Sequence, residues 1–353
     1  MRVLGSGVAC AAAISVRDAS ATLAIVDLGQ WPGATQDWAG VAGMSADGAV
    51  IVGSDEGRAF RWDGSLHEIA GAKTASAANA DGSIIVGTTS AERAFRWSND
   101  DGLQDLGTVA GGTGSEALGV SADGSIVVGR ATTAAGSVPW IWGVGGGMRS
   151  LGALDGATSG SATAVSRDGT VVVGSSGNRA FRWTVDGGMQ DISPPLSDTG
   201  WAAANAVSAD GEVVVGWYSY ATGVGVRPLQ FRWSGSEGFS DLPSEWGATS
   251  PGSARAADEH ATHIYGRLFM ALIDASVWSR ATGTVKLADV LQAEGLDLAG
   301  WTLMEAVAAS DDGDVVAGIG TRQVGDDVAY LSWRVSGINS VGPIFTDGFD
   351  AAD

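Results

Sequence analysis

Cysteine and histidine are almost missing from this chain of 353 residues. It has one cysteine, Cys10, and three histidines. A single thiol excludes an internal disulfide bond. With so few histidines, no Ser-His-Asp or Cys-His arrangement for nucleophilic catalysis can be read from the sequence. We therefore predict a protein without a catalytic residue set, a cofactor or a bound metal.

Positive charge is also scarce. The chain has 20 Lys and Arg residues against 40 Asp and Glu residues, a formal net charge of −20. Such a field repels nucleic acid, whose binding needs clustered Lys and Arg, and it disfavours anionic membrane surfaces. No stretch beyond the N-terminus approaches 18 consecutive apolar residues, so no transmembrane helix is predicted. We expect a monomer that does not bind nucleic acid and does not span a membrane.

The N-terminus has the features of an export signal. Arg2 precedes a small apolar stretch, and Ala19-Ser20-Ala21 offers a cleavage site. Gly7-Val8-Ala9-Cys10 is similar to a lipoprotein processing site but lacks its leucine. Lipidation of Cys10 is therefore not predicted, although it stays open. The predicted divisions are a signal peptide at 1–21, one folded domain at 22–336 and a tail at 337–353. The predicted location is extracellular, with the periplasm or cell surface as alternatives.

Glycine, by contrast, is abundant, with 54 residues, and much of it belongs to a repeat. The clearest copy is Ser-Ala-Asp-Gly-Ser-Ile-Val-Val-Gly at 121–129. Its closing glycine recurs roughly every 35 to 50 residues, a period typical of repeat architectures. The seven closing glycines are Gly53, Gly87, Gly129, Gly174, Gly216, Gly266 and Gly318.

Each repeat contains four short strand-like segments. In the third repeat they cover 117–121, 126–128, 139–142 and 148–151. The first two are joined by Asp123-Gly124, a dipeptide that favours a tight hairpin. Seven repeats of four antiparallel strands predict an all-β fold, a seven-bladed β-propeller. A solenoid or β-helix is the alternative, although solenoids have capping repeats at both ends.

The two ends of the repeat region complement each other. The seventh repeat lacks a fourth segment, while Ala24–Gly29 precedes the first repeat and matches Leu103–Gly107. The N-terminal strand is therefore predicted to complete the last blade, which closes the ring and covers an open sheet edge.

One tryptophan per repeat follows the second strand at a similar spacing. Recurrence in each repeat indicates packing between blades rather than a binding site. The arginines that precede most of these tryptophans are expected to form ion pairs or to stack on rings. The tryptophans are Trp62, Trp97, Trp142, Trp183, Trp233, Trp278 and Trp333.

These motifs together resemble the bacterial extracellular HAF repeat family. The resemblance covers about residues 24–335 and depends on Ala94-Phe95-Arg96-Trp97, Gly102–Thr108 and the Ser-Ala-Asp-Gly copies. It implies a secreted repeat protein and gives no enzymatic activity to carry over. The family histidine is replaced by arginine at 58, 93 and 179, so no role of that histidine carries over. The Asp-Gly turns are also similar to those of TolB-type propellers, which implies binding rather than catalysis.

Two sets of loops vary in length, those between the second and third strands and those between repeats. Both sets emerge on the same face of an antiparallel blade, and Leu287–Leu298 is expected to form a helical turn there. Variable loops on a rigid scaffold commonly carry function. We hypothesise an aromatic ligand-binding face for a polysaccharide or cell-surface ligand; packing of the loops is the alternative role. The residues are Trp31, Trp201, Trp217, Tyr218, Tyr220, Trp246 and Trp301.

One cluster contains two of the three histidines: Asp258, Glu259, His260 and His263. It lies on the hairpin turn of the sixth repeat, where residues three apart point to opposite faces, so metal binding is not predicted but stays open. The favoured interpretation of the chain is a secreted, non-enzymatic binding or surface-interaction propeller. The alternatives are a polysaccharide lyase or hydrolase on this scaffold, and a passenger domain of an autotransporter or adhesin.

Overall fold

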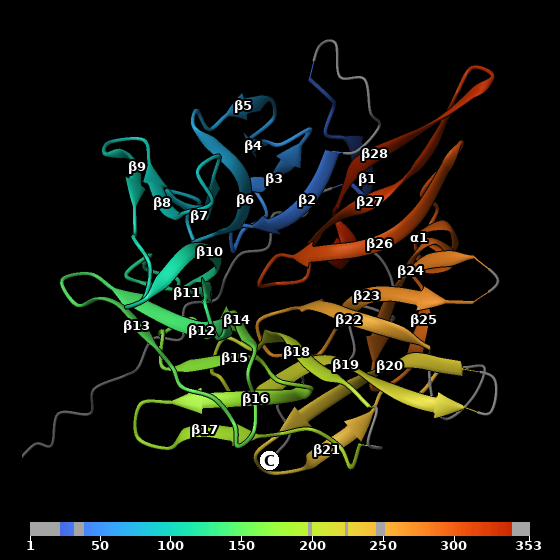
Figure 1. Ribbon diagram of the computed structural model, residues 1–353. Helices are drawn as coiled ribbons and strands as arrows, with labels where there is room; N and C mark the ends of the chain where they lie inside the picture. The colour runs from blue at the N-terminus through green and yellow to red at the C-terminus, as the bar shows by residue number, and fades with distance from the viewer. Residues whose placement is uncertain are drawn as a thin grey trace, which may run out of the picture.

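The structure is a computed structural model that describes residues 22–31, 39–196, 200–222, 225–244, 251–270 and 272–340. These residues form seven four-stranded antiparallel sheets. Figure 1 shows the sheets arranged as the blades of a ring. The predicted seven-bladed β-propeller is confirmed. The predicted signal peptide, with Cys10, and the tail beyond Ser340 lie outside the described residues.

Six blades take four consecutive strands each. The first three blades are β2 (Ala39–Met44), β3 (Ile51–Asp55), β4 (Arg58–Trp62) and β5 (Leu66–Glu68); β6 (Ala72–Ala78), β7 (Ile84–Thr89), β8 (Ala94–Ser98) and β9 (Gly102–Asp105); and β10 (Gly112–Val120), β11 (Ile126–Thr133), β12 (Gly136–Gly143) and β13 (Gly147–Ser150). The next three are β14 (Gly160–Val165), β15 (Val171–Ser176), β16 (Arg179–Thr184) and β17 (Gly188–Asp191); β18 (Ala202–Val207), β19 (Val213–Thr222), β20 (Gly225–Ser234) and β21 (Gly238–Asp241); and β22 (Gly252–Ala257), β23 (Ile264–Phe269), β24 (Ile273–Ser279) and β25 (Gly283–Lys286).

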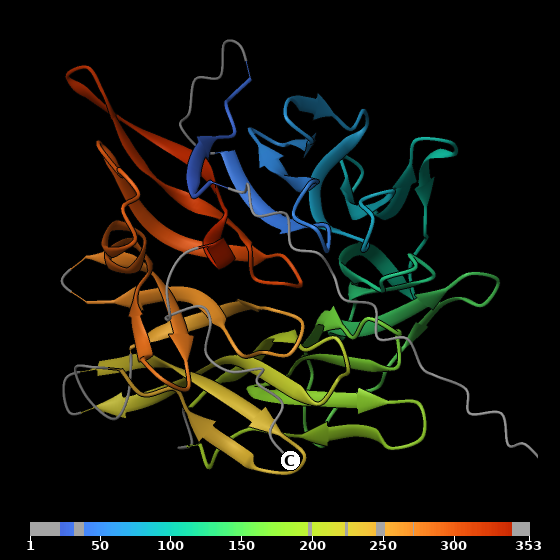
Figure 2. The ribbon, with the colours of Figure 1, turned by 180° about the vertical axis from the view of Figure 1, so that it is seen from behind.

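The seventh blade joins the two ends of the chain. It contains β26 (Trp301–Ala309), β27 (Val315–Val324) and β28 (Asp327–Ser336), and its outer strand is β1 (Ala24–Asp27). Ala24 pairs with Ser336 and Asp27 with Trp333. Figures 1 and 2 both show blue β1 beside red β28. The predicted closure by the N-terminal strand is confirmed, and it covers the edge that β28 would otherwise expose.

Each closing glycine lies where no side chain fits. A Cβ on Gly129 would lie 1.9 Å from the carbonyl oxygen of Glu116 and 2.7 Å from the ring of Trp140. A Cβ on Gly53 would meet the Gly40 carbonyl oxygen at 2.1 Å and the Phe60 ring at 2.7 Å. Glycine is therefore required because the first strand and a cross-strand ring both approach the backbone closely.

The tryptophan position holds in six blades and not in the seventh. Trp62 pairs with Ile51, two residues before Gly53 in the ladder, and five other blades have the same register. Trp333 pairs instead with Gly318, the position that Phe60 takes opposite Gly53. The prediction was wrong for Trp333 because the sequence spacing does not determine its cross-strand partner. Trp333 fills the space over Gly318 and is fully buried.

Hydrogen bonds within each Asp-Gly turn explain why an aspartate stands there. In the first blade, Ser45 Oγ and the Ala49 N–H both donate to Asp47 Oδ1, at 2.6 and 3.0 Å. The Val50 N–H donates in turn to Ser45 Oγ at 2.9 Å. Ser121 and Asp123 repeat this arrangement, so the aspartates are explained by the geometry of the hairpin.

One short helix departs from the repeat. α1 (Leu287–Ala293) follows β25 and buries Leu287, Val290 and Leu291, which confirms the helical turn expected in this loop. A single-turn 3₁₀ helix covers Ile338–Ser340 after β28. No helix among the described residues is long and apolar enough to cross a bilayer.

Candidate functional site

The space along the propeller axis differs at its two ends. The end bearing the Asp-Gly turns holds a cavity of about 160 Å³. The opposite end, where the variable loops emerge, holds a cavity of about 690 Å³. Ligand pockets commonly measure about 300 to 1,000 Å³, so only the loop-end cavity has the usual size.

The turn end is closed by backbone hydrogen bonds that run from blade to blade. One N–H in each of the seven hairpin turns at this end donates to the carbonyl oxygen of the turn in the neighbouring blade, at 2.8 to 3.1 Å. The seventh bond returns to the first blade, so the bonds form a closed circle. In order around the axis the residues are Ala46, Ala80, Ala122, Arg167, Ala209, Glu259 and Asp311.

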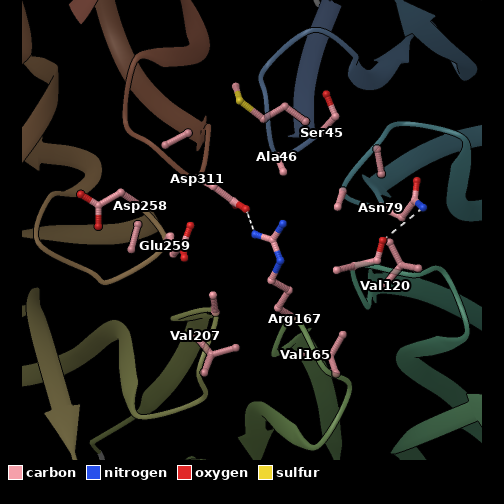
Figure 3. Close-up of a pocket in the computed structure, with 17 residues that line it drawn as sticks. Ser45, Ala46, Asn79, Val120, Val165, Arg167, Val207, Asp258, Glu259 and Asp311 are labelled. Carbon is pink, nitrogen blue, oxygen red and sulfur yellow. Dashed lines mark hydrogen bonds and ion pairs between the residues drawn. The ribbon is translucent and has the colours of Figure 1, made fainter. Parts of the chain in front are cut away.

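An ion pair crosses this circle. Arg167 extends from the fourth blade over the axis and contacts Asp311 of the seventh, as Figure 3 shows, with Glu259 beside them. Burial raises the pKa of the Asp311 carboxyl and nearby Glu259 adds to this, whereas the Arg167 guanidinium opposes the shift. The pair occupies the middle of the turn end, which leaves the loop end as the wider entrance to the axis.

β-Bulges line the loop-end cavity. The first strand of each blade carries a register shift beside the closing glycine, and the unpaired residue at this shift lines the cavity. A bulge leaves one residue outside the ladder and re-aims its side chain. Six of the seven are uncharged and the other is an arginine. They are Ala42, Ser76, Leu118, Thr163, Asn205, Arg255 and Val307.

Charge in the cavity is concentrated at one point. Arg255 Nε donates to Glu305 Oε1 at 2.6 Å, and Arg267 Nη1 donates to Glu305 Oε2 at 3.1 Å. Glu305 is only 5% exposed. Burial lowers the pKa of the Arg267 guanidinium and the charge of Arg255 lowers it further, while Glu305 raises it. Two cations therefore share one buried carboxylate.

Two other polar side chains of the cavity donate to backbone carbonyls. Thr163 Oγ1 donates to the carbonyl oxygen of Ala204, and Asn205 Nδ2 donates to that of Ala254, both at 2.6 Å. These bonds link neighbouring blades. The remaining lining is largely apolar, with Leu118, Met304, Val307, Ile319 and Leu331 among its residues.

The predicted aromatic face is only partly exposed. Trp201, just before β18, is 55% exposed. Trp217 and Trp301 are half-buried in β19 and β26, and the Arg322 guanidinium lies 5.3 Å from the Trp301 ring. Tyr218 is buried, and its hydroxyl donates to Asp241 Oδ1 at 2.7 Å.

Trp31 is half-buried beside the first blade, where its backbone N–H donates to Asp55 Oδ2 at 3.4 Å. Trp246 and the side chain of Tyr220 lie outside the description. None of the five described rings lines the loop-end cavity. The aromatic binding face stays a prediction, and the structure adds a cavity that the sequence did not indicate.

The histidine cluster is part of a turn. His263 Nδ1 lies 2.9 Å from Asp258 Oδ2, and Asp258 also accepts hydrogen bonds from Thr262 and from the His263 backbone N–H. His260 is exposed, with Nε2 3.8 Å from Glu259 Oε1. The described residues contain no group of three His, Cys, Asp or Glu side chains that could hold a metal ion.

Arg255 and Glu305 were missed in the sequence because they are 50 residues apart. One signal was present. The first strands consist mostly of small or apolar residues, and Arg255 is one of the few charged residues among them. A charged residue in a strand otherwise suited to the crowded axis marks a candidate axial group.

No family model and no curated protein matches this chain. Among solved structures, it is similar to a chain of the crystal structure of a mitotic checkpoint complex, at a TM-score of 0.53 and 16% identity over 95% of this chain and 99% of that one. It is also similar to TolB from Acinetobacter baumannii, at a TM-score of 0.43 and 13% identity over 68% of this chain, and it spans 60% of that chain's length. The likeness to a putative TolB from Agrobacterium tumefaciens has a TM-score of 0.45 and 16% identity, and it covers 63% of this chain and 87% of that one. At 16% identity, the likeness to the chain of the checkpoint complex shows the fold alone.

Proposed function

We propose that the protein is a secreted, monomeric, non-enzymatic binding propeller that takes its ligand at the loop end of the axis. The carrying observation is the difference between the two ends: about 690 Å³ of largely apolar space at one and a hydrogen-bonded circle at the other. A well-formed apolar cavity with a few convergent polar groups is the usual form of a small-ligand site. The resemblance to HAF repeats supports the same role.

The proposal favours binding over polysaccharide cleavage. Glycoside hydrolysis by the common mechanism uses two carboxyl groups that flank the scissile bond. Among the described residues that line the cavity, Glu305 alone carries a carboxylate, and two arginines hold it. A polysaccharide or cell-surface ligand remains part of the proposal for the rim, where the exposed Trp201 ring offers a stacking surface.

Calorimetric titration with a panel of oligosaccharides and small organic acids tests this function. Leu118→Trp should fill the cavity and abolish binding, since Leu118 lies at the third-blade bulge. Val144→Trp, at a 68% exposed position in the turn between β12 and β13, is the matched control and should bind as the wild type does. Equal binding by Leu118→Trp would refute the cavity as the site, and cell fractionation separates a secreted protein from a surface-retained adhesin.

A further inference from the structure

We infer that the loop-end cavity binds an aliphatic monocarboxylate, whose carboxylate pairs with the guanidinium of Arg255 and whose apolar body occupies the axial space. This inference rests on the proposed function and adds the chemical class of the ligand. It is drawn from three observations: the charge at one wall, the hydrogen bonds that remain to be made there, and the lining of the rest of the cavity.

The charged side chains at the cavity wall have an excess of positive charge. Glu305 is the shared partner of Arg255 and Arg267, so the three side chains together carry one excess positive charge. The Arg267 side chain is 29% exposed and stacks on Phe269, with its guanidinium carbon 4.8 Å from the ring centroid. A charge in such surroundings is stabilised by a nearby opposite charge. An anion in the cavity would supply it.

Arg255 is the cationic member of this group that lines the cavity, beside Glu305. Its side chain is 38% exposed, and the described residues engage only its Nε. The two terminal nitrogens form the end of the guanidinium fork, which matches the two oxygens of a carboxylate. Thr163 and Asn205 already donate to backbone carbonyls, so Arg255 is the cationic group that a ligand meets.

The remaining lining suits an aliphatic body. Leu118, Val307 and Ile319 line the interior, and Ile273 and Tyr330 stand at the rim, 37% and 43% exposed. Large apolar side chains that remain exposed around a cavity commonly mark a binding site. A polyanion such as an acidic polysaccharide is disfavoured because the chain carries a net charge of −20. A single carboxylate incurs much less of this repulsion.

The test is calorimetric titration of the full chain with octanoate, 1-octanol, octylamine and acetate. Octanoate should bind, 1-octanol should bind at least about tenfold more weakly, and octylamine and acetate should not bind measurably. Arg255→Met should weaken octanoate about 10- to 100-fold and leave 1-octanol unchanged. Arg280→Met, a 68% exposed position paired with Glu237, makes the same charge change outside the cavity and should have no effect.

A peptide arm separates two sources of the same chemistry. An apolar hexapeptide with a free C-terminal carboxylate is compared with its C-terminal amide and with octanoate. If the peptide carboxylate binds more tightly than octanoate, the natural ligand is the C-terminus of a polypeptide. If octanoate binds more tightly, the natural ligand is a small aliphatic acid. Thermal unfolding of Arg255→Met checks that it folds, and Leu118→Trp blocks the cavity in an otherwise intact site.

Four results would overturn the inference. Equal affinity for octanoate and 1-octanol, or unchanged octanoate binding by Arg255→Met, would show that Arg255 does not recognise a ligand carboxylate. Either result would leave the proposed binding function in place. If a neutral oligosaccharide binds, Leu118→Trp abolishes that binding, and octanoate does not bind, the ligand is not a carboxylate but the cavity is still the binding site. If no probe binds the wild type, the proposed function fails together with the inference.

Discussion

At the scale of single residues, six of the seven blades pair an aromatic residue with the closing glycine. Phe60, Phe95, Phe181 and Phe231 are at most 1% exposed, and each pairs with the closing glycine of its blade. The neighbouring tryptophans are less deeply buried. The phenylalanine, rather than the tryptophan that the repeat emphasises, is therefore the deeper packing residue.

The second blade allows a direct comparison. Phe95 is fully buried and Trp97 is only partly buried, so Phe95→Ala should lower the free energy of unfolding by about 3 to 5 kcal/mol and Trp97→Ala by less. Equilibrium unfolding in urea measures both variants. An equal or larger loss for Trp97→Ala would contradict this ranking.

At the scale of the element, the Asp-Gly hairpin is stabilised by an ionised carboxylate. The Ser121 hydroxyl and the Ser125 N–H and hydroxyl hold the pKa of Asp123 at about 2, against 3.8 for the free side chain. The pKa of Asp81 is lowered as well, first by the Ser83 hydroxyl and then by the Ser83 N–H. Several blades share this arrangement, so its pH dependence is a property of the repeat.

The sign of that dependence follows from the lowered pKa. The contribution of Asp123 to stability is present above pH 3.8 and is lost as the pH falls from about 4 to about 2. Asp123→Ala should lower the free energy of unfolding by about 1 kcal/mol at pH 6, where it removes hydrogen bonds to a carboxylate. The difference from the wild type should shrink at pH 2.

Urea unfolding at the two pH values measures the difference. Asp186→Ala, in the exposed turn between β16 and β17, is the control and should stay within about 0.5 kcal/mol of the wild type. A loss for Asp123→Ala that is the same at both pH values would show that the carboxylate charge is not involved.

At the scale of the whole molecule, the ring is closed twice. At the turn end the hydrogen-bonded circle joins Asp311 to Ala46, and at the outer edge β1 pairs with β28. Leu28 adds a buried side chain and donates its N–H to the Ser332 carbonyl oxygen at 3.0 Å. The first and seventh blades are therefore connected near the axis and at the periphery.

Removal of β1 tests the outer closure. A chain that begins at residue 30 lacks β1 and Leu28, so the edge of β28 becomes available for pairing with another chain. Its unfolding temperature should fall and it should self-associate, whereas a chain that begins at residue 22 keeps β1 and should behave as the full chain does. Calorimetry and size-exclusion chromatography measure both properties. Identical behaviour of the two truncations would show that β1 is dispensable.

Local patterns in the sequence were sufficient for the architecture. The blade number, the Asp-Gly hairpins, the helical turn at Leu287 and the return of Ala24–Asp27 to the last blade are all written in contiguous residues whose spacing repeats. Such features depend on turn geometry and strand periodicity, which act over a few residues.

The tertiary structure alone decided which side chains meet at the axis. Register placed Trp333 over Gly318, and the bulges beside the closing glycines turned one residue per blade toward the cavity, features that no residue spacing specifies. Arg255 meets Glu305 because neighbouring blades pack side by side at the axis, and Arg167 meets Asp311 because the fourth and seventh blades converge in a closed ring. The strands are thus encoded locally, whereas the cavity and its charge arise from the assembly of all seven blades.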